Sequence, residues 1–240
     1  MKESSKSIAR RIKDPRFITR YIVGSGMDIG GKPDPLSLHR AVFPLMTQLK
    51  VWDLEDGDAQ YMESVLDESL DFVYSSHTLE HMVDPHIALK NWFRIIKPGG
   101  HLVISIPDED LYEQGDFDQK YNKHHKHTFT IFKQKSWSKV SINVVDLVQS
   151  LDANAQLCFI NLEDTHYRYD LPRFDQTRAP MIESAIEFIV RKRTAQELVD
   201  YGRIHKEAGW DDVDRLHFTQ YFYDQRAAAE SYPEPFGETK

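Results

Sequence analysis

Three residues that can bind a metal or move a proton stand close together in the middle of the chain. His77, Glu80 and His81 have the spacing i, i+3, i+4, which places side chains on one face of a helical turn. Residues 124–127 add three more histidines. Two imidazoles and a carboxylate suit Zn²⁺, Mn²⁺ or Fe²⁺ better than Mg²⁺, whereas an imidazole alone can serve as a general base. We predict proton transfer by His77, His81 or His127 and no bound metal, with structural packing of His81 as the alternative.

The elements that must position these residues follow from local patterns. An apolar run over residues 70–74 predicts a strand, and Asp84 with Pro85 forms an N-cap and first-turn proline that open a helix. Residues 97–100, KPGG, are predicted to end that helix, and residues 101–106 form a second β-branched run. A strand, a helix and a strand of these lengths predict a parallel sheet with a right-handed crossover.

This succession resembles the second half of the class I S-adenosylmethionine-dependent methyltransferase domain. Residues 71–100, DFVYSSHTLEHMVDPHIALKNWFRIIKPGG, contain in order a strand, a loop ending in LEH, an amphipathic helix and KPGG. The resemblance implies an α/β, Rossmann-like fold with a mostly parallel sheet and an antiparallel last strand. The family places a helix and a third strand after the second strand. Here only residues 54–57 separate Asp53 from the next motif, so we expect a sheet shortened around strands two and three.

The same resemblance implies S-adenosylmethionine as the cofactor and S-adenosylhomocysteine as its product. Asp28, Gly30 and Gly31, in YIVGSGMDIGG, match the start of the family's cofactor loop, although residues 32–35 replace its later glycines with KPDP. A glycine is needed where the backbone passes close to the cofactor with positive φ. Asp53 follows at a distance suited to bind the ribose hydroxyls, with a helix N-cap as the alternative.

Two further pairs of residues are assigned by their match to the family. Asp58 and Ala59, in GDAQ, resemble the segment that contacts adenine. Ser76 and His77, at the end of the strand before LEH, would line the methionine portion of the cofactor and the substrate entrance.

Substrate contacts are expected just after the strand at residues 101–106. Asp108, Tyr112 and Glu113 follow it and are predicted to bind the acceptor, with solvated loop positions as the alternative. The histidine cluster also resembles the metal-dependent O-methyltransferases of quinone synthesis and of small-RNA 3′ ends. Those enzymes carry Glu-x-x-Glu-His, and His77 stands where their first glutamate would be.

The chain is predicted to have three parts. Residues 1–20 form a basic lead-in or lid, residues 21–193 the cofactor-binding domain, and residues 194–240 a helical, aromatic extension. Residues 156–160 and 184–191 are predicted to be the last two strands, paired antiparallel.

Composition restricts the partners and the compartment. The 240 residues carry a net charge of −8, which disfavours a general nucleic-acid binder. No apolar run is long enough for a membrane span, and the N-terminus does not resemble a secretory signal. The lone Cys158 fits a reducing, cytoplasmic compartment.

The sequence therefore predicts a cytoplasmic methyltransferase that acts on a small molecule, by O-methylation of a sugar or a similar metabolite. Two alternatives stay open: an RNA 2′-O-methyltransferase with a metal-assisted site, and a non-catalytic scaffold with a degenerate cofactor loop. A dinucleotide oxidoreductase is disfavoured, because LEH and KPGG have no part in that chemistry.

Overall fold

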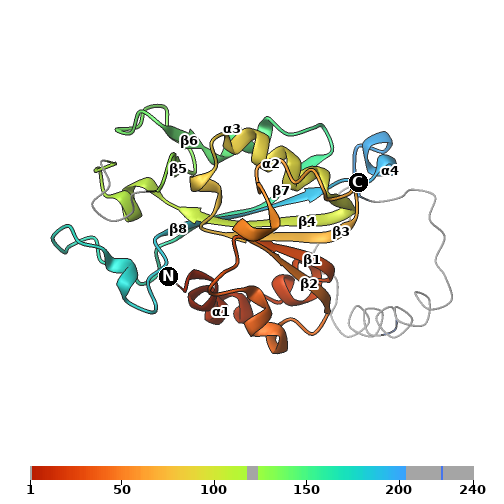
Figure 1. The fold of residues 1–240 in the computed structure, drawn as a ribbon, viewed down its shortest axis with the longest axis horizontal. Coiled ribbons are helices and arrows are strands. Elements are labelled where there is room, and N and C mark those ends of the chain that lie inside the picture. Colours follow the sequence, from red (N-terminus) through yellow and green to blue (C-terminus); the bar gives the residue numbers. More distant parts are fainter. Residues whose placement is uncertain (1, 118–123, 204–222, 224–240) are drawn as a thin grey trace, which may run out of the picture. The chain divides into compact units, whose positions relative to one another are not determined.

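The computed structural model describes residues 2–117, 124–203 and 223. The chain divides into two compact units, residues 1–198 and 199–240. The first unit holds every strand of the described chain and is drawn in Figure 1. Of the C-terminal extension only the start, including helix α4 (Ala195–Val199), lies within the described residues. The predicted helical and aromatic character beyond residue 203 otherwise lies outside them, apart from Tyr223.

A six-stranded sheet forms the centre of the first unit, in the order β2-β1-β3-β4-β8-β7. Its strands are β1 (Gly24–Ile29), β2 (Met46–Trp52), β3 (Leu70–Ser76), β4 (Ile96–Pro107), β7 (Ala155–Glu163) and β8 (Ala185–Lys192). The pairs among β2, β1, β3 and β4 are parallel, and β8 pairs antiparallel with both β4 and β7. This mixture of directions confirms the predicted α/β class with an antiparallel end of the sheet.

Helices cover both faces of the sheet. Because successive side chains of a strand point to opposite faces, each face has its own hydrophobic core. On β3, Val73 packs into one core and its neighbours Phe72 and Tyr74 into the other. The helices α2 (Pro85–Arg94) and α3 (Val144–Gln149) lie over the first face, and α1 (Glu3–Lys13) lies on the opposite side (Figure 1). The sheet is thus the middle of three layers, with its carboxyl strand ends free to carry a site.

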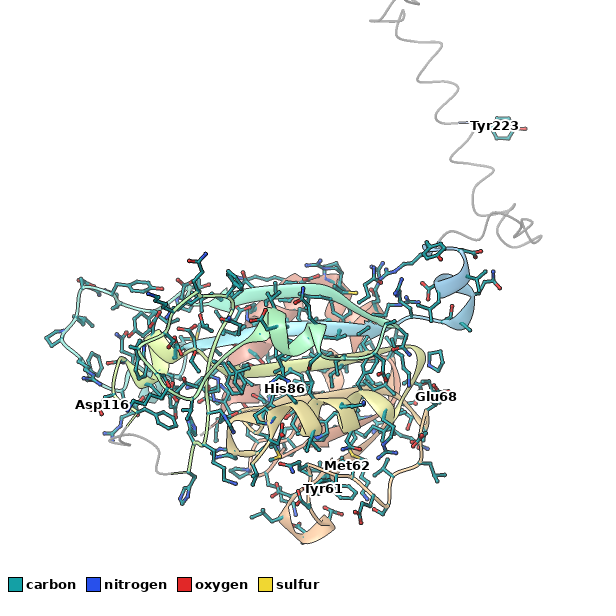
Figure 2. The ribbon with its side chains drawn as sticks, turned by 90° about the horizontal axis from the view of Figure 1, so that it is seen from above. Tyr61, Met62, Glu68, His86, Asp116 and Tyr223 are labelled. Atoms are coloured by element: carbon teal, nitrogen blue, oxygen red, sulfur yellow. The ribbon has the colours of Figure 1, made fainter. Side chains whose placement is uncertain are left out.

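The connection from β2 to β3 is short, as the sequence predicts. Residues 53–69 contain only the 3₁₀ helix Leu54–Asp56 and turns, so β2 lies at the edge of the sheet. Figure 2 labels Tyr61 and Met62 in this connection, beside α2. The Arg94 guanidinium of α2 donates to the Met62 carbonyl at 3.1 Å, and the Trp92 indole donates to the Ala59 carbonyl at 2.7 Å. Hydrogen bonds from α2 side chains therefore fix the connection between β2 and β3, which contains no strand of its own.

Some local expectations needed correction. The polar and charged sequence of residues 109–139 predicts no buried element, yet the segment contains the buried π-helical turn Glu109–Glu113 and the buried strand β5 (Thr128–Thr130). The spacing of apolar residues over 141–151 predicts a helix, but the segment begins as strand β6 (Ser141–Asn143), which pairs with β5, before α3 starts. The KPGG residues already belong to β4 rather than ending α2. Within the described ranges no helix has the length and apolar character of a membrane span.

Candidate active site

Two chain bends meet at the carboxyl ends of the neighbouring strands β1 and β3. Gly30 follows β1 with a φ of +71°, and a Cβ added there would lie 2.1 Å from the Thr78 hydroxyl. That hydroxyl donates to the Ile29 carbonyl at 3.1 Å, so it ties the second bend to the first. His77, between Ser76 and Thr78, has the unusual φ of +53°, a strained conformation that concentrates at functional sites.

A cavity of about 180 Å³ opens between these bends. The predicted residues Gly30, Gly31, Ser76, His77, His81 and Tyr112 all line it. Its other walls come from α1, from the loop after Gly31, and from two later segments, and consist of Glu3, Ser4, Lys32, Pro33, Asp34, Glu80 and His125. The structure therefore brings together the glycine turn and the HTLEH segment, as the sequence predicts.

Glu80 is the centre of the polar cluster in this cavity. Its side chain is 0% exposed, and neither carboxylate oxygen has a hydrogen-bond partner in the described part of the chain. Three imidazole nitrogens surround its Oε1: Nδ1 of His77 at 3.7 Å, Nε2 of His125 at 3.8 Å and Nε2 of His81 at 3.9 Å. Burial raises the pKa of Glu80 well above its ordinary value.

The imidazoles of the cluster are uncharged at neutral pH. Burial, with a smaller contribution from His125, lowers the pKa of His77 to about 3. Burial likewise lowers the pKa of His125 to about 4, and it lowers that of His81. Each neutral ring keeps one nitrogen lone pair, so the cavity offers several hydrogen-bond acceptors or metal ligands at one place.

Of the predicted substrate residues, Tyr112 and Glu113 belong to the cluster. The Tyr112 ring stacks on His125 with centroids 5.3 Å apart, and it lies 5.9 Å from the His77 ring. Glu113 Oε1 lies 2.7 Å from His125 Nδ1, and burial raises the pKa of Glu113 to about 8. Asp108 instead caps the turn after β4, accepting hydrogen bonds from the amides of Asp110 and Leu111, and it lies outside the cavity lining.

His127 does not line the cavity. Its Nε2 lies 3.1 Å from the Val83 carbonyl, while His125 takes the position beside Glu80. The run of three histidines in residues 124–127 identified the segment. The sequence of residues 124–127 does not show which imidazole enters the cavity. The orientation of the segment depends on the amides of Lys126 and His127, both of which donate to the Glu80 carbonyl. The catalytic role of His127 stays a prediction, and the geometry favours His125.

The remaining cofactor candidates support the loops beside the cavity. The Asp28 carboxylate accepts a hydrogen bond from the Leu36 amide at 2.7 Å, which closes the loop that starts at Gly30. Asp53 accepts from the amides of Leu54 at 2.8 Å and Lys32 at 3.1 Å, so it caps the 3₁₀ helix and also touches the cofactor loop. Asp58 and Ala59 hold their own segment: the Asp58 carboxylate accepts from the Gln60 amide, and the Ala59 carbonyl accepts from Trp92.

A family model of the methyltransferase domain matches residues 14–141, which is more than half of the chain. The chain belongs to this family. The match covers the glycine turn, the connection to β3, and the HTLEH and KPGG segments of this methyltransferase. No curated protein matches its sequence.

The chain is similar to several solved structures. A SAM-dependent methyltransferase from Archaeoglobus fulgidus has a TM-score of 0.50 and 16% identity, over 80% of this chain and 95% of that one. A protein from Bacillus halodurans described as a methyltransferase has a TM-score of 0.48 and 15% identity, over 78% and 99% of the two chains. A methyltransferase from Clostridium acetobutylicum has a TM-score of 0.45 and 10% identity, over 80% and 92%. The likeness to the Archaeoglobus fulgidus structure shows the fold.

The sequence of this methyltransferase predicts S-adenosylmethionine as its cofactor. The residues at the cavity suit such a ligand. Gly30 and Gly31 present bare backbone to it, and a Cβ at Gly31 would lie 2.6 Å from the Asp28 carboxylate. The carboxyl groups of Glu3, Asp34 and Glu80 line the same space and offer oxygen atoms to the ammonium group of the cofactor.

Proposed function

We propose that this methyltransferase transfers the methyl group of S-adenosylmethionine to a hydroxyl oxygen of a small molecule, such as a sugar or a similar metabolite. The cluster of neutral imidazoles around Glu80 supports an oxygen acceptor. A site rich in hydrogen-bond acceptors and without a protonated base favours a substrate that donates, as a hydroxyl group does. The net charge of −8 disfavours a nucleic-acid acceptor.

The proposed arrangement places the cofactor across the glycine turn. A volume of about 180 Å³ is below the roughly 300–1,000 Å³ of ordinary ligand pockets. We therefore assign the cavity to the methionine end, and we assign the nucleoside to the outer side of the loop, next to Asp53. The cofactor supplies an activated methyl group, so the protein mainly aligns donor and acceptor. His77 and Ser76 would lie beside the sulfonium, and Tyr112 would shield it from water.

Helix α1 is proposed to act as the lid of this site. Glu3 and Ser4 line the cavity, and the Ser5 amide and hydroxyl donate to the Asp34 carboxylate at 2.8 and 2.5 Å. The helix thus contacts the loop that would hold the cofactor. A cytoplasmic location is proposed from the single Cys158, which fits a reducing compartment.

The proposal is tested with the purified full chain in two steps. Calorimetry with S-adenosylmethionine and S-adenosylhomocysteine should show binding of both in the micromolar range. Transfer of radioactive methyl groups from the cofactor is then measured with a panel of sugars and other hydroxyl metabolites, and with RNA oligonucleotides. An alkali-stable methyl ether on a small molecule supports the proposal. Failure to bind either cofactor form would favour a scaffold, and labelling of RNA alone would make this an RNA methyltransferase.

Replacing Asp53 by alanine should weaken cofactor binding by about 1–3 kcal/mol, because charged hydrogen bonds to the ribose would be lost. Calorimetry measures the change. Asp56→Ala is the matched control, since Asp56 accepts from the Asp53 amide at 3.1 Å and stabilises the same turn, whereas the bond to the Lys32 amide of the loop is made by Asp53. Equal losses in the two variants would show that Asp53 acts only as a helix cap.

A further inference from the structure

We propose that Glu80, His81 and His125 bind a divalent transition-metal ion, beside which the acceptor hydroxyl of the proposed reaction would lie. The sequence led us to expect no metal here, and the folded arrangement changes that expectation. The proposal rests on the proposed function for the role of the metal, but not for the existence of the site.

The three side chains are close enough to share one ion. One possible ligand atom from each lies within 4.8 Å of the others. Glu80 Oε1 is 3.9 Å from His81 Nε2 and 3.8 Å from His125 Nε2. Ligand bonds of about 2.0–2.2 Å in a tetrahedral site separate two ligands by about 3.3–3.6 Å. The two pairs with Glu80 must close by a few tenths of an ångström, and the remaining pair by at most about 1.5 Å, to complete the coordination.

The outer nitrogens of both histidines are already held as metal-binding histidines are. His81 Nδ1 lies 3.0 Å from the His124 carbonyl, which can only accept, so Nδ1 carries the proton and the Nε2 lone pair faces Glu80. His125 Nδ1 lies 2.7 Å from Glu113 Oε1. A histidine ligand usually donates its second ring nitrogen to a carbonyl or a carboxylate in just this way.

The buried carboxylate supports a cation independently. Glu80 is 0% exposed, and neither of its oxygens has a hydrogen-bond partner among the described residues. A buried carboxyl group without a partner either keeps its proton or binds a metal ion, and a metal ion bound here would replace that proton. Lys126 and His127 donate their amides to the Glu80 backbone carbonyl, which fixes the residue while leaving its side chain without a donor.

The donor set selects the class of metal. Two imidazoles and one carboxylate suit Zn²⁺, Fe²⁺, Mn²⁺ or Co²⁺, whereas Mg²⁺ and Ca²⁺ prefer oxygen ligands. Three protein ligands leave a position open, as in catalytic sites. His77, whose Nδ1 lies 3.7 Å from Glu80 Oε1, stands next to it.

At that open position a metal would bind the oxygen of the acceptor hydroxyl and ease loss of its proton to water. The oxygen then forms a bond to the methyl carbon while the carbon–sulfur bond breaks. The electron pair of that bond stays on sulfur, and the cofactor leaves as the neutral thioether S-adenosylhomocysteine. The metal is neither oxidised nor reduced.

The test uses the full chain without a histidine tag, stripped with a chelator and dialysed. Zn²⁺ and Co²⁺ are titrated by calorimetry, and bound metal is counted by elemental analysis. We expect about one equivalent per chain, with visible Co²⁺ absorption typical of tetrahedral or five-coordinate nitrogen and oxygen ligation. Glu80→Gln and His125→Ala should lower the affinity at least 100-fold, and Glu113→Gln, which only alters the support of His125, about 10–100-fold.

His86→Ala is the matched control, because His86 is an exposed histidine bonded to the Ser150 hydroxyl, outside the cluster. It should bind metal as the unaltered chain does. Circular dichroism identifies variants that fail to fold. If Glu80→Gln fails to fold, the metal affinity of Glu113→Gln still decides the test. No binding of Zn²⁺ or Co²⁺, or binding equally strong in Glu80→Gln and His125→Ala, would overturn the proposal.

Cofactor binding to the metal-free chain separates the two proposals. Micromolar binding of S-adenosylmethionine by a chain that binds neither Zn²⁺ nor Co²⁺ in the titration would leave the methyltransferase proposal standing and reject the metal site. Metal binding without cofactor binding would do the reverse.

Discussion

Replacing Glu187 by glutamine is expected to lower the free energy of unfolding by about 3–5 kcal/mol, because it leaves a buried guanidinium without its counter-charge. Glu187 on β8 and Arg11 on α1 are both 0% exposed and form an ion pair, with Arg11 Nε 3.0 Å from the carboxylate. Arg10 pairs with the same carboxylate. Burial opposes the charge on Glu187, but the two guanidinium groups outweigh it and hold its pKa below the ordinary value. Urea unfolding at neutral pH measures the loss.

Asp170→Asn is the control for this experiment. It also removes a carboxylate from an arginine pair, but the side chains of Arg168 and Asp170 are 60% and 67% exposed, so little change in stability is expected. The double variant Arg11→Met/Glu187→Leu should recover part of the loss, since a buried pair replaced by apolar residues is tolerated. Equal effects of Glu187→Gln and Asp170→Asn would show that the buried pair does not hold α1.

The parts of the fold that the sequence predicted are those set by local chemistry. The Asp84 carboxylate accepts hydrogen bonds from the amides of His86 and Ile87, so the predicted N-cap does start α2. The apolar run at residues 70–74 lies within β3, where it is buried on both sides of the sheet. Signals of this kind depend on neighbouring residues, and they can be found without knowledge of the folded chain.

The long-range contacts that hold α1 and complete the site could not be found in this way. Arg11 meets Glu187 across 176 positions of sequence, and His81 meets the His124 carbonyl across 43. His125 enters the cluster because Glu113 and Tyr112 hold its ring, and nothing in the sequence near residue 125 predicts those partners. The predicted residues His77, Ser76 and the glycines reach the cavity because parallel strands end at the same edge of the sheet. No such rule predicts where side chains from loops, such as His125, will lie.

The pH dependence of stability provides the second large effect, at Asp28. This carboxyl group is 0% exposed, and its Oδ1 has no hydrogen-bond partner in the described part of the chain. Burial raises its pKa from 3.8 to about 7, the Leu36 amide and Arg11 oppose that rise, and nearby Asp34 and Asp53 add to it. Folded Asp28 therefore holds its proton more tightly than the unfolded chain does. Its contribution to stability is complete below about pH 4 and is lost as the pH rises through 7.

Asp28→Asn cannot titrate, so its stability should fall less with rising pH than that of the unaltered chain. A shift from 3.8 to about 7 corresponds to about 4 kcal/mol in all, of which about 2–3 kcal/mol falls between about pH 5 and pH 8. Urea unfolding of both chains across this range, without cofactor, measures the difference. Other buried acids titrate in both chains, so their effects cancel in the difference between the two stabilities. In the control Asp108→Asn, the difference in stability from the unaltered chain should develop at lower pH, because burial raises the pKa of Asp108 only to about 6. Parallel curves for Asp28→Asn and the unaltered chain would mean that Asp28 is ionised in the folded protein, and that the cofactor loop closes on a charged carboxylate.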